Sequence, residues 1–134
     1  MAFEIPGFDF SLQSSGDMSS HQYKAVQAST TNVAGGATVV ATRGGAVTGV
    51  LQENATQATP QRVRVTGVTK LQAGDSSAME NAITEGGKVV ASSVGQAVPS
   101  TGAGQHLLGI ALEGLSTGST GIIPVLLTIG AIST

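Results

Sequence analysis

Glycine residues divide this sequence into short apolar segments that are rich in β-branched side chains. There are 19 glycines in 134 residues, and Gly-Gly pairs at 35–36, 44–45 and 86–87 separate such segments. Many short β-branched runs with Gly turns at a spacing of about 8–12 residues are typical of a barrel or a sandwich. We therefore predict an all-β fold, a small β-barrel or sandwich of short strands.

Alternation of apolar and polar residues predicts where the strands lie. Val63 and Val65 alternate with Arg62 and Arg64, which is the pattern of a half-buried strand. Further strands are expected over His21–Ala28, Ala37–Thr42, Val47–Gln52, Val68–Leu71, Lys88–Ser93, Gly95–Val98, Leu107–Glu113 and Ile122–Ile129. At most one short helix is expected, over Asp75–Thr84. The predicted core consists of Val39, Val50, Val63, Val65, Val89, Ile110, Leu112, Val125 and Leu127.

Two parts of the chain resemble each other weakly. The segment 35–41 (GGATVVA) is similar to 86–91 (GGKVVA). Each is followed by a further similar strand, 49–53 (GVLQE) and 109–113 (GIALE). This similarity suggests two related β units that wrap into one barrel.

The first twenty residues differ in composition from the rest. Three of the four aromatic residues lie there, Phe3, Phe8 and Phe10, beside Pro6 and a glycine that interrupt regular structure. We predict an extended N-terminal arm, residues 1–20, ahead of a β-barrel domain, residues 21–134. Aromatic side chains are common interface anchors. The arm either inserts these anchors into a neighbouring protein or packs on its own barrel as an edge strand.

Charged residues make up 10% of the chain, against about 25% for a typical soluble domain. A surface with so few charges suggests that much of it is covered by further copies of this protein or by a larger assembly. We expect a homo-oligomer, with a homotrimer as first choice and a dimer as second. The net charge of −2 and six scattered basic residues argue against a nucleic acid partner. We expect no membrane partner either, since the most apolar run, Ile122–Ile132, is short and holds Pro124. No signal peptide is expected.

The sequence offers no catalytic, metal or cofactor motif. Cysteine is absent, and His21 and His106 are far apart in sequence. Gly102–Gly104 leads into an apolar strand, not a helix, so we interpret it as a loop and not as a phosphate cradle. Glu53 and Glu113 end similar segments and are interpreted as strand-end carboxylates that face water. We therefore predict that the protein is not an enzyme and needs no cofactor.

Several segments in order resemble the phage capsid cement proteins, the small head-decoration proteins. The matching residues are Phe3–Ser11, Gln22-Tyr23, Gly49–Gln52, Val65–Lys70 with Ala73-Gly74, Gly109–Glu113 and Gly121–Leu127. Each segment is ordinary β-strand sequence, and the resemblance rests on their order and spacing. Members of the subgroup often carry a proline soon after the Gly-Val-Leu-Gln strand, whereas here the proline comes later, at Pro60.

The resemblance implies a β-barrel that binds the outer capsid surface of a virion and bridges and stabilises subunits of the major capsid protein. Such a protein would be made in the host cytoplasm. The expected capsid or subunit interface contains Phe3, Pro6, Phe8, Phe10, Tyr23, Arg62 and Arg64, although both arginines could simply keep an exposed face soluble. The alternatives are a tail or baseplate β-module of a phage, a small oligomeric β-sheet enzyme, and a sugar-binding module.

Overall fold

The computed structural model describes residues 2–29, 36–54, 56, 59–74 and 81–134. In these residues it contains eleven strands and no helix, which confirms the predicted all-β fold. The strands are β1 (Ile5–Pro6), β2 (Asp9–Gln13), β3 (Ala25–Ser29), β4 (Gly36–Val39), β5 (Gly49–Leu51), β6 (Pro60–Arg64), β7 (Gly67–Ala73), β8 (Lys88–Ala91), β9 (Ala97–Pro99), β10 (Leu107–Ala111) and β11 (Gly121–Leu127). Helices long and apolar enough to cross a membrane are absent from this part of the chain.

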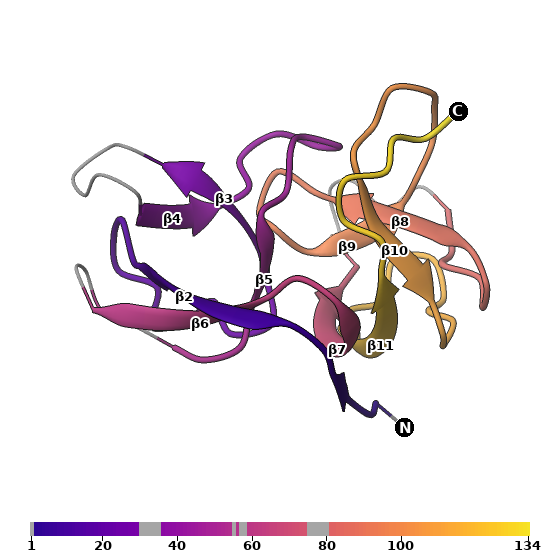
Figure 1. Ribbon diagram of the computed structural model, residues 1–134. Helices are drawn as coiled ribbons and strands as arrows, with labels where there is room; N and C mark the ends of the chain where they lie inside the picture. The colour runs from indigo at the N-terminus through magenta and orange to yellow at the C-terminus, as the bar shows by residue number, and fades with distance from the viewer. Residues whose placement is uncertain (1, 30–35, 55, 57–58, 75–80) are drawn as a thin grey trace.

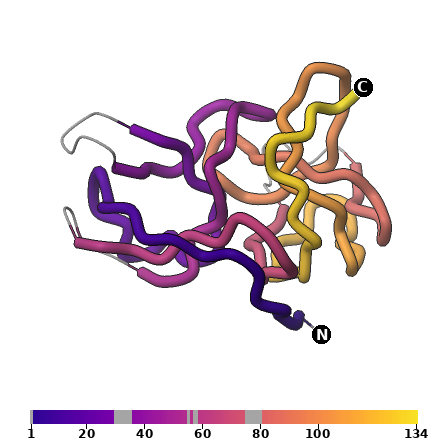
Figure 2. The backbone as a smooth tube through the Cα atoms, in the orientation of Figure 1, coloured from indigo at the N-terminus to yellow at the C-terminus, as the bar shows by residue number. Residues whose placement is uncertain are grey.

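The strands form two sheets that lie side by side (Figures 1 and 2). The C-terminal sheet has the order β1-β7-β11-β10-β8-β9, and β9 also pairs with β7 at Ala97 and Ala73. This last pairing closes β7 to β11 into a barrel, and β1 adds to its side. The N-terminal sheet has the order β2-β6-β5-β3-β4, with a parallel bridge between Ser14 and Ala37 at its ends.

The two sheets are structural repeats of each other. Raising each strand number of the N-terminal sheet by five gives β7-β11-β10-β8-β9, the order of the C-terminal barrel. The registers agree as well. Val50 faces Arg64 between β5 and β6, and Ile110 faces Leu126 in the same way between β10 and β11. The chain is therefore built from two equivalent five-stranded units.

The backbone before β3 and β8 supports this equivalence. Tyr23 has a φ of 64°, which non-glycine residues seldom adopt, and its equivalent Gly86 has a φ of 81°. The Tyr23 N–H donates to the carbonyl of Leu51 (2.7 Å), and the Gly86 N–H donates to that of Ala111 (2.7 Å). The same left-handed turn thus precedes the second strand of each unit.

The similarity noticed in the sequence is half correct. The segments that begin at Gly49 and Gly109 form the equivalent strands β5 and β10. The other pair is wrong, because Gly36–Val39 is β4, whose equivalent is β9, whereas Lys88–Ala91 is β8. Glycine followed by valine and alanine is common in this chain, so that match arose in the wrong register. The units also form two sheets instead of wrapping into one barrel.

The main core fills the C-terminal barrel and extends into the N-terminal sheet. Its buried members include Leu71, Leu108 and Val125, and also Ala25, Val40 and Val50 from the N-terminal side. A second core lies within the N-terminal sheet around Leu51 and Val63, with Phe10 and Leu12 packed against it. Because the first cluster spans both sheets, the described residues fold as one body.

Five of the nine predicted core residues are buried: Val50, Val63, Val89, Val125 and Leu127. The other four, Val39, Val65, Ile110 and Leu112, are only half-buried. Val65 lies beyond the end of β6, where the chain turns into β7, so the predicted alternation stops at Arg64 and that arginine is buried. Of the expected helix, residues 75–80 lie outside the described residues. The remainder is not helical, and Ile83 forms a β-bridge with Leu115.

Candidate functional site

The N-terminal segment lies along both sheets of its own chain. β1 pairs with β7, with Ile5 opposite Val68, and β2 pairs with β6, with Asp9 opposite Arg64. Both strands are at the ends of their sheets. Of the two alternatives for this segment, these pairings match the edge strand on its own barrel. The binding of its side chains to a partner remains a prediction.

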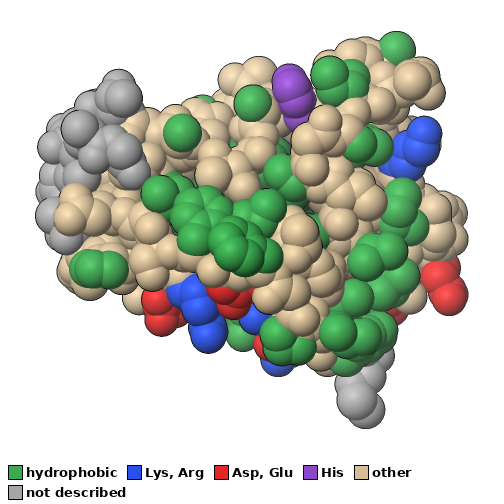
Figure 3. All heavy atoms as spheres, in the orientation of Figure 1, with side chains coloured by type: hydrophobic (Ala, Val, Ile, Leu, Met, Phe, Trp, Pro, Cys, Tyr) green, Lys and Arg blue, Asp and Glu red, His purple; other side chains and the backbone are tan. Residues whose placement is uncertain are grey.

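The aromatic side chains of this segment differ in exposure. Phe3 is 45% exposed and Phe8 is 61% exposed, whereas Phe10 is half-buried against the core of the N-terminal sheet. The rings of Phe8 and Phe10 stack with their centroids 6.2 Å apart. The Phe8 N–H donates to Thr66 Oγ1 (2.7 Å), which fixes the backbone at this residue. Figure 3 shows hydrophobic side chains gathered over β2 on this face.

The two predicted interface arginines have different surroundings. Arg64 is buried, and its Nε and Nη2 donate to Asp9 Oδ1 and Oδ2 at 2.8 and 3.1 Å. Glu4 Oε1 lies 3.8 Å from its Nη1. Donating these hydrogen bonds to Asp9 raises the pKa of Arg64 above its usual range. Arg62 is largely exposed, and its Nε lies 3.7 Å from Asp9 Oδ2. Arg62 is therefore accessible to a partner, whereas Arg64 holds the N-terminal segment in place.

Pro6 and Tyr23 complete the predicted set. Pro6 lies in β1 opposite Gly67. Tyr23 lies before β3, where its carbonyl accepts the N–H of Gln72 (2.8 Å) and its ring lies 5.8 Å from Lys70 Nζ. Phe10 on β2, both arginines on β6 and Phe8 just before β2 are thus brought together, and Phe3 and Pro6 lie earlier in the same segment. Tyr23 lies at the junction of the two sheets.

Sequence reasoning missed an apolar row on the outside of the C-terminal sheet. Ile5, Val68, Leu126 and Ile110 are successive cross-strand neighbours on β1, β7, β11 and β10. Leu126 is 42% exposed, and Ile122 on the same face of β11 is 46% exposed. Figure 3 shows a second hydrophobic group there, over β10 and β11. The sequence of β11 did contain a signal for this outer face. Ile123, Val125 and Leu127 are buried and alternate with the exposed Ile122 and Leu126.

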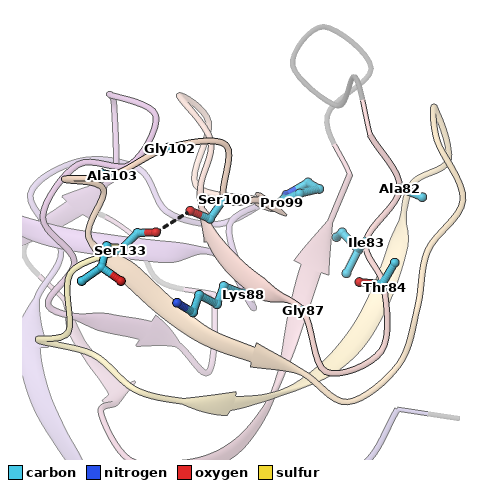
Figure 4. Close-up of a pocket in the computed structure, with 11 residues that line it drawn as sticks. Ala82, Ile83, Thr84, Gly87, Lys88, Pro99, Ser100, Gly102, Ala103 and Ser133 are labelled. Carbon is cyan, nitrogen blue, oxygen red and sulfur yellow. Dashed lines mark hydrogen bonds between the residues drawn. The ribbon is translucent and has the colours of Figure 1, made fainter.

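A hollow of about 390 Å³ lies at the end of this row, beside the start of β8. Lys88 is the neighbour of Ile110 across β8 and β10, and in Figure 4 it lies between Ser133 and the pair Ile83 and Thr84. Ser100 Oγ is 3.1 Å from Ser133 Oγ in the wall. Gly102 and Ala103, which the sequence placed in a plain loop, also line it.

No arrangement for catalysis or metal binding is evident among the described residues. Groups of three or more His, Asp or Glu side chains that could hold a metal ion do not occur in that part of the chain. Burial lowers the pKa of His21, and the nearby Lys24 lowers it further. The candidate functional features described above are exposed apolar side chains such as Phe8 and Leu126.

Comparison with known proteins identifies the family of this chain. Residues 19–127 match the family model of the phage cement proteins. The chain belongs to this family. As a cement protein it has a structural role in the virion, the decoration of the capsid. The predicted family and role are thereby confirmed.

A solved structure has the same fold as this cement protein. It is described as the head fiber gp8.5 N base in bacteriophage phi29 and aligns with a TM-score of 0.65. The alignment covers 90% of this chain and 93% of that chain at 14% sequence identity. No curated protein matches the sequence.

Proposed function

We propose that this cement protein binds the outer surface of the phage head and bridges neighbouring subunits of the major capsid protein. It would be made in the host cytoplasm and act without catalysis, as a homotrimer or alternatively a dimer. In this proposal residues 1–20 are the docking segment and residues 21–134 are the body that carries it. The capsid role comes from the family, and the exposed aromatic side chains of the docking segment supply the contact.

The observation that carries the proposal is the exposure of Phe3 and Phe8 on either side of β1, a strand that is already paired. Pairing of β1 with β7 and the hydrogen bond from Phe8 to Thr66 order this segment before any partner binds. Little conformational entropy is then lost on docking. Full burial of one Phe side chain contributes roughly 1.5–3 kcal/mol, so two anchors give a contact of moderate strength.

Several moderate contacts per assembly suffice for a cement function. When one copy of an oligomer is bound, the others face their sites at a high effective concentration. Simultaneous release from several capsid subunits is then rare, and the junctions between those subunits are held together. Arg62 extends the surface with an accessible charge, while Arg64 supports it through Asp9.

The test is binding to bare capsids of the parent phage. Phe3→Ser combined with Phe8→Ser should leave the melting temperature nearly unchanged, because both side chains are exposed, and should weaken capsid binding at least tenfold (about 1.4 kcal/mol). Val94→Ser, which removes an exposed apolar side chain outside the docking segment, is the matched control. Undiminished binding by the double variant would contradict the proposal, and binding to tails instead of heads would favour the tail or baseplate alternative.

Point variants test the role of the aromatic anchors better than deletion of residues 2–14 would. Such a deletion removes β1 from one sheet and β2 from the other. It would therefore unfold parts of both sheets, and a loss of capsid binding could not be assigned to the anchors.

A further inference from the structure

We propose that the outer face of the C-terminal barrel, around Ile110, Leu126 and the Lys88 hollow, binds the N-terminal sheet of a second copy of this chain. The copies would associate head to tail. The two units are structurally equivalent, and the N-terminal unit already uses the equivalent face as an interface within the chain.

Within one chain, the N-terminal sheet packs on the C-terminal barrel through a docking face made of Ala25, Val40 and Val50. All three are fully buried and belong to the same core cluster as Leu71 and Ala73 of β7. Hydrogen bonds join the two units along the contact. The Ala25 N–H donates to the Gly95 carbonyl, and the Gln72 N–H donates to the Tyr23 carbonyl, both at 2.8 Å.

The equivalents of the docking face are identified by register. Ala25 faces Val50 between β3 and β5, and Lys88 faces Ile110 between β8 and β10. The Val40 N–H donates to the Ala25 carbonyl (3.1 Å), and the Ser100 N–H donates to that of Lys88 (3.0 Å). The C-terminal barrel therefore carries the same face, made of Lys88, Ser100 and Ile110.

This second face is uncovered. Lys88 is exposed, and Ser100 and Ile110 are half-buried, whereas their three equivalents are fully buried. Leu126 is equivalent to Arg64, which is buried in its own unit, and yet Leu126 is 42% exposed. Exposed apolar side chains such as Leu126 and Ile5, on the outer wall of a small barrel, typically mark an interaction site when they lie together.

The hollow of Figure 4 has the same explanation. In the contact within the chain, Gly95 lies so close to Lys24, Ala25 and Val39 that an added Cβ would meet all three. Their equivalents are Gly87, Lys88 and Pro99, and these three residues line the hollow. The hollow is thus the place that a neighbouring unit fills in the first repeat and leaves open in the second.

The equivalence of the two units also indicates which strand should bind the uncovered face. The unit that covers the docking face contributes β7, and the equivalent of β7 in the N-terminal sheet is β2. Gln72 of β7, which contacts Tyr23, corresponds to Gln13 at the end of β2, and Gln13 is exposed. In Figure 1, β2 ends on the left and β8 begins on the right, so β2 cannot reach the uncovered face of its own chain. A second copy brings its β2 to the uncovered face.

Head-to-tail contacts of this kind close into rings when the rotation between copies permits. The inference therefore specifies the surface used in the proposed self-association, and it rests on that part of the proposed function alone. Lys88 and Ser100 replace Ala25 and Val40, so the contact between copies is more polar than the one within the chain. It should accordingly be weaker and reversible.

Engineered cysteines test the contact directly, because the chain has none of its own. Glu85 is equivalent to Gln22, whose carbonyl accepts a hydrogen bond from Gln72 Nε2 (2.8 Å), so Glu85 of one copy should meet Gln13 of the next. The variant Gln13→Cys with Glu85→Cys should form disulfide-linked chains of three and more copies on mild oxidation. Each single variant can form dimers at most.

A mismatched pair is the control for random collisions. Gln13→Cys with Thr117→Cys, an exposed residue in the loop before β11, should give no species beyond a background of dimers. Adding Leu126→Asp to the productive pair should reduce the linked chains at least tenfold. Absence of linked chains from the folded productive pair, both free at high concentration and on capsids, would overturn the inference.

The partner can also be identified on assembled particles. A benzophenone amino acid in place of Leu126 should crosslink to a second copy of this chain, and crosslinking to the major capsid protein would overturn the inference. The oxidation experiment on free protein does not involve capsids. It can therefore fail while capsid binding through Phe3 and Phe8 holds, or succeed while that binding fails.

Discussion

Arg64 holds Asp9 through two parallel hydrogen bonds, and these connect β6 to the start of β2. Arg64 is buried, so removal of Asp9 breaks both of its short hydrogen bonds in a poorly hydrated place and leaves Glu4, 3.8 Å away, as its remaining counter-charge. We expect Asp9→Asn to lower the free energy of unfolding by about 3 kcal/mol. Arg62→Met removes an exposed charge 3.7 Å from the same carboxylate and should cost less than about 0.5 kcal/mol. Urea denaturation of both variants measures the difference, and equal effects would contradict this assignment.

The barrel core should respond strongly to truncation of Leu108. This side chain is fully buried in β10 among residues from both sheets. Leu108→Ala should cost about 2–5 kcal/mol of unfolding free energy. Leu126→Ala, the same change at an exposed position of the neighbouring strand, should cost less than about 1 kcal/mol. Thermal and chemical unfolding would show whether the two differ, and a similar loss at both positions would refute the distinction between inner and outer faces.

Gly109 should tolerate no side chain. An added Cβ there would run into the backbone carbonyl of Leu126, and the equivalent Gly49 would meet Val63 and the carbonyl of Arg64. Gly109→Ala must therefore push β10 away from β11, and we expect a loss above about 3 kcal/mol or no soluble protein. Gly16→Ala is the matched control, because no atom lies near its added Cβ. A stable Gly109→Ala variant would mean that the two strands are spaced differently.

Stability should decrease in mild acid because of His21. Burial, with help from Lys24, lowers the pKa of His21 below the usual value of about 6.5. The folded protein then binds fewer protons than the unfolded chain, so the stabilisation is complete above about pH 6.5 and is lost as the pH falls through the folded pKa. His21→Asn should flatten the unfolding free energy between about pH 7 and pH 5.

The control for this pH effect is Asp17, which lies nearby. Hydrogen bonds from Ser19 lower its pKa, so its contribution is lost only at a more acidic pH, below about 3.9. Asp17→Asn should therefore leave the change between pH 7 and pH 5 intact. The assignment to His21 would be wrong if Asp17→Asn removed that change or His21→Asn did not.

Local patterns were sufficient to predict the fold class and much of the core. Val50, Val63 and Val125 are apolar residues between turn-forming segments, and period-two alternation places such residues inside a sheet. The same rule misplaced Arg64, because its burial depends on Asp9, which is far away in sequence. A cross-strand partner of this kind leaves no trace in the residues next to Arg64.

The repeat was visible in the sequence, but only one of its two matches has the right register. A match that the sequence comparison lacked is AVQAS of β3 with KVVAS, which is β8 and the next residue, and another is Leu12-Gln13 with Leu71-Gln72. These short matches gain meaning only when the strand order shows that their positions are equivalent. The same holds for the candidate site. Composition alone pointed to Phe3 and Phe8, whereas the outer face of β11 could be recognised only from the strand register.

The pairing of β1 with β7 and of β2 with β6 has a consequence for biosynthesis. β1 and β2 leave the ribosome well before the strands with which they pair, since Ile5 must wait for Val68. Contacts so distant in sequence slow folding. During that interval Phe3, Phe8 and Phe10 sit on a nascent chain without the strands that later position them. The proposed capsid-binding surface is thus complete only after β6 and β7 have been synthesised.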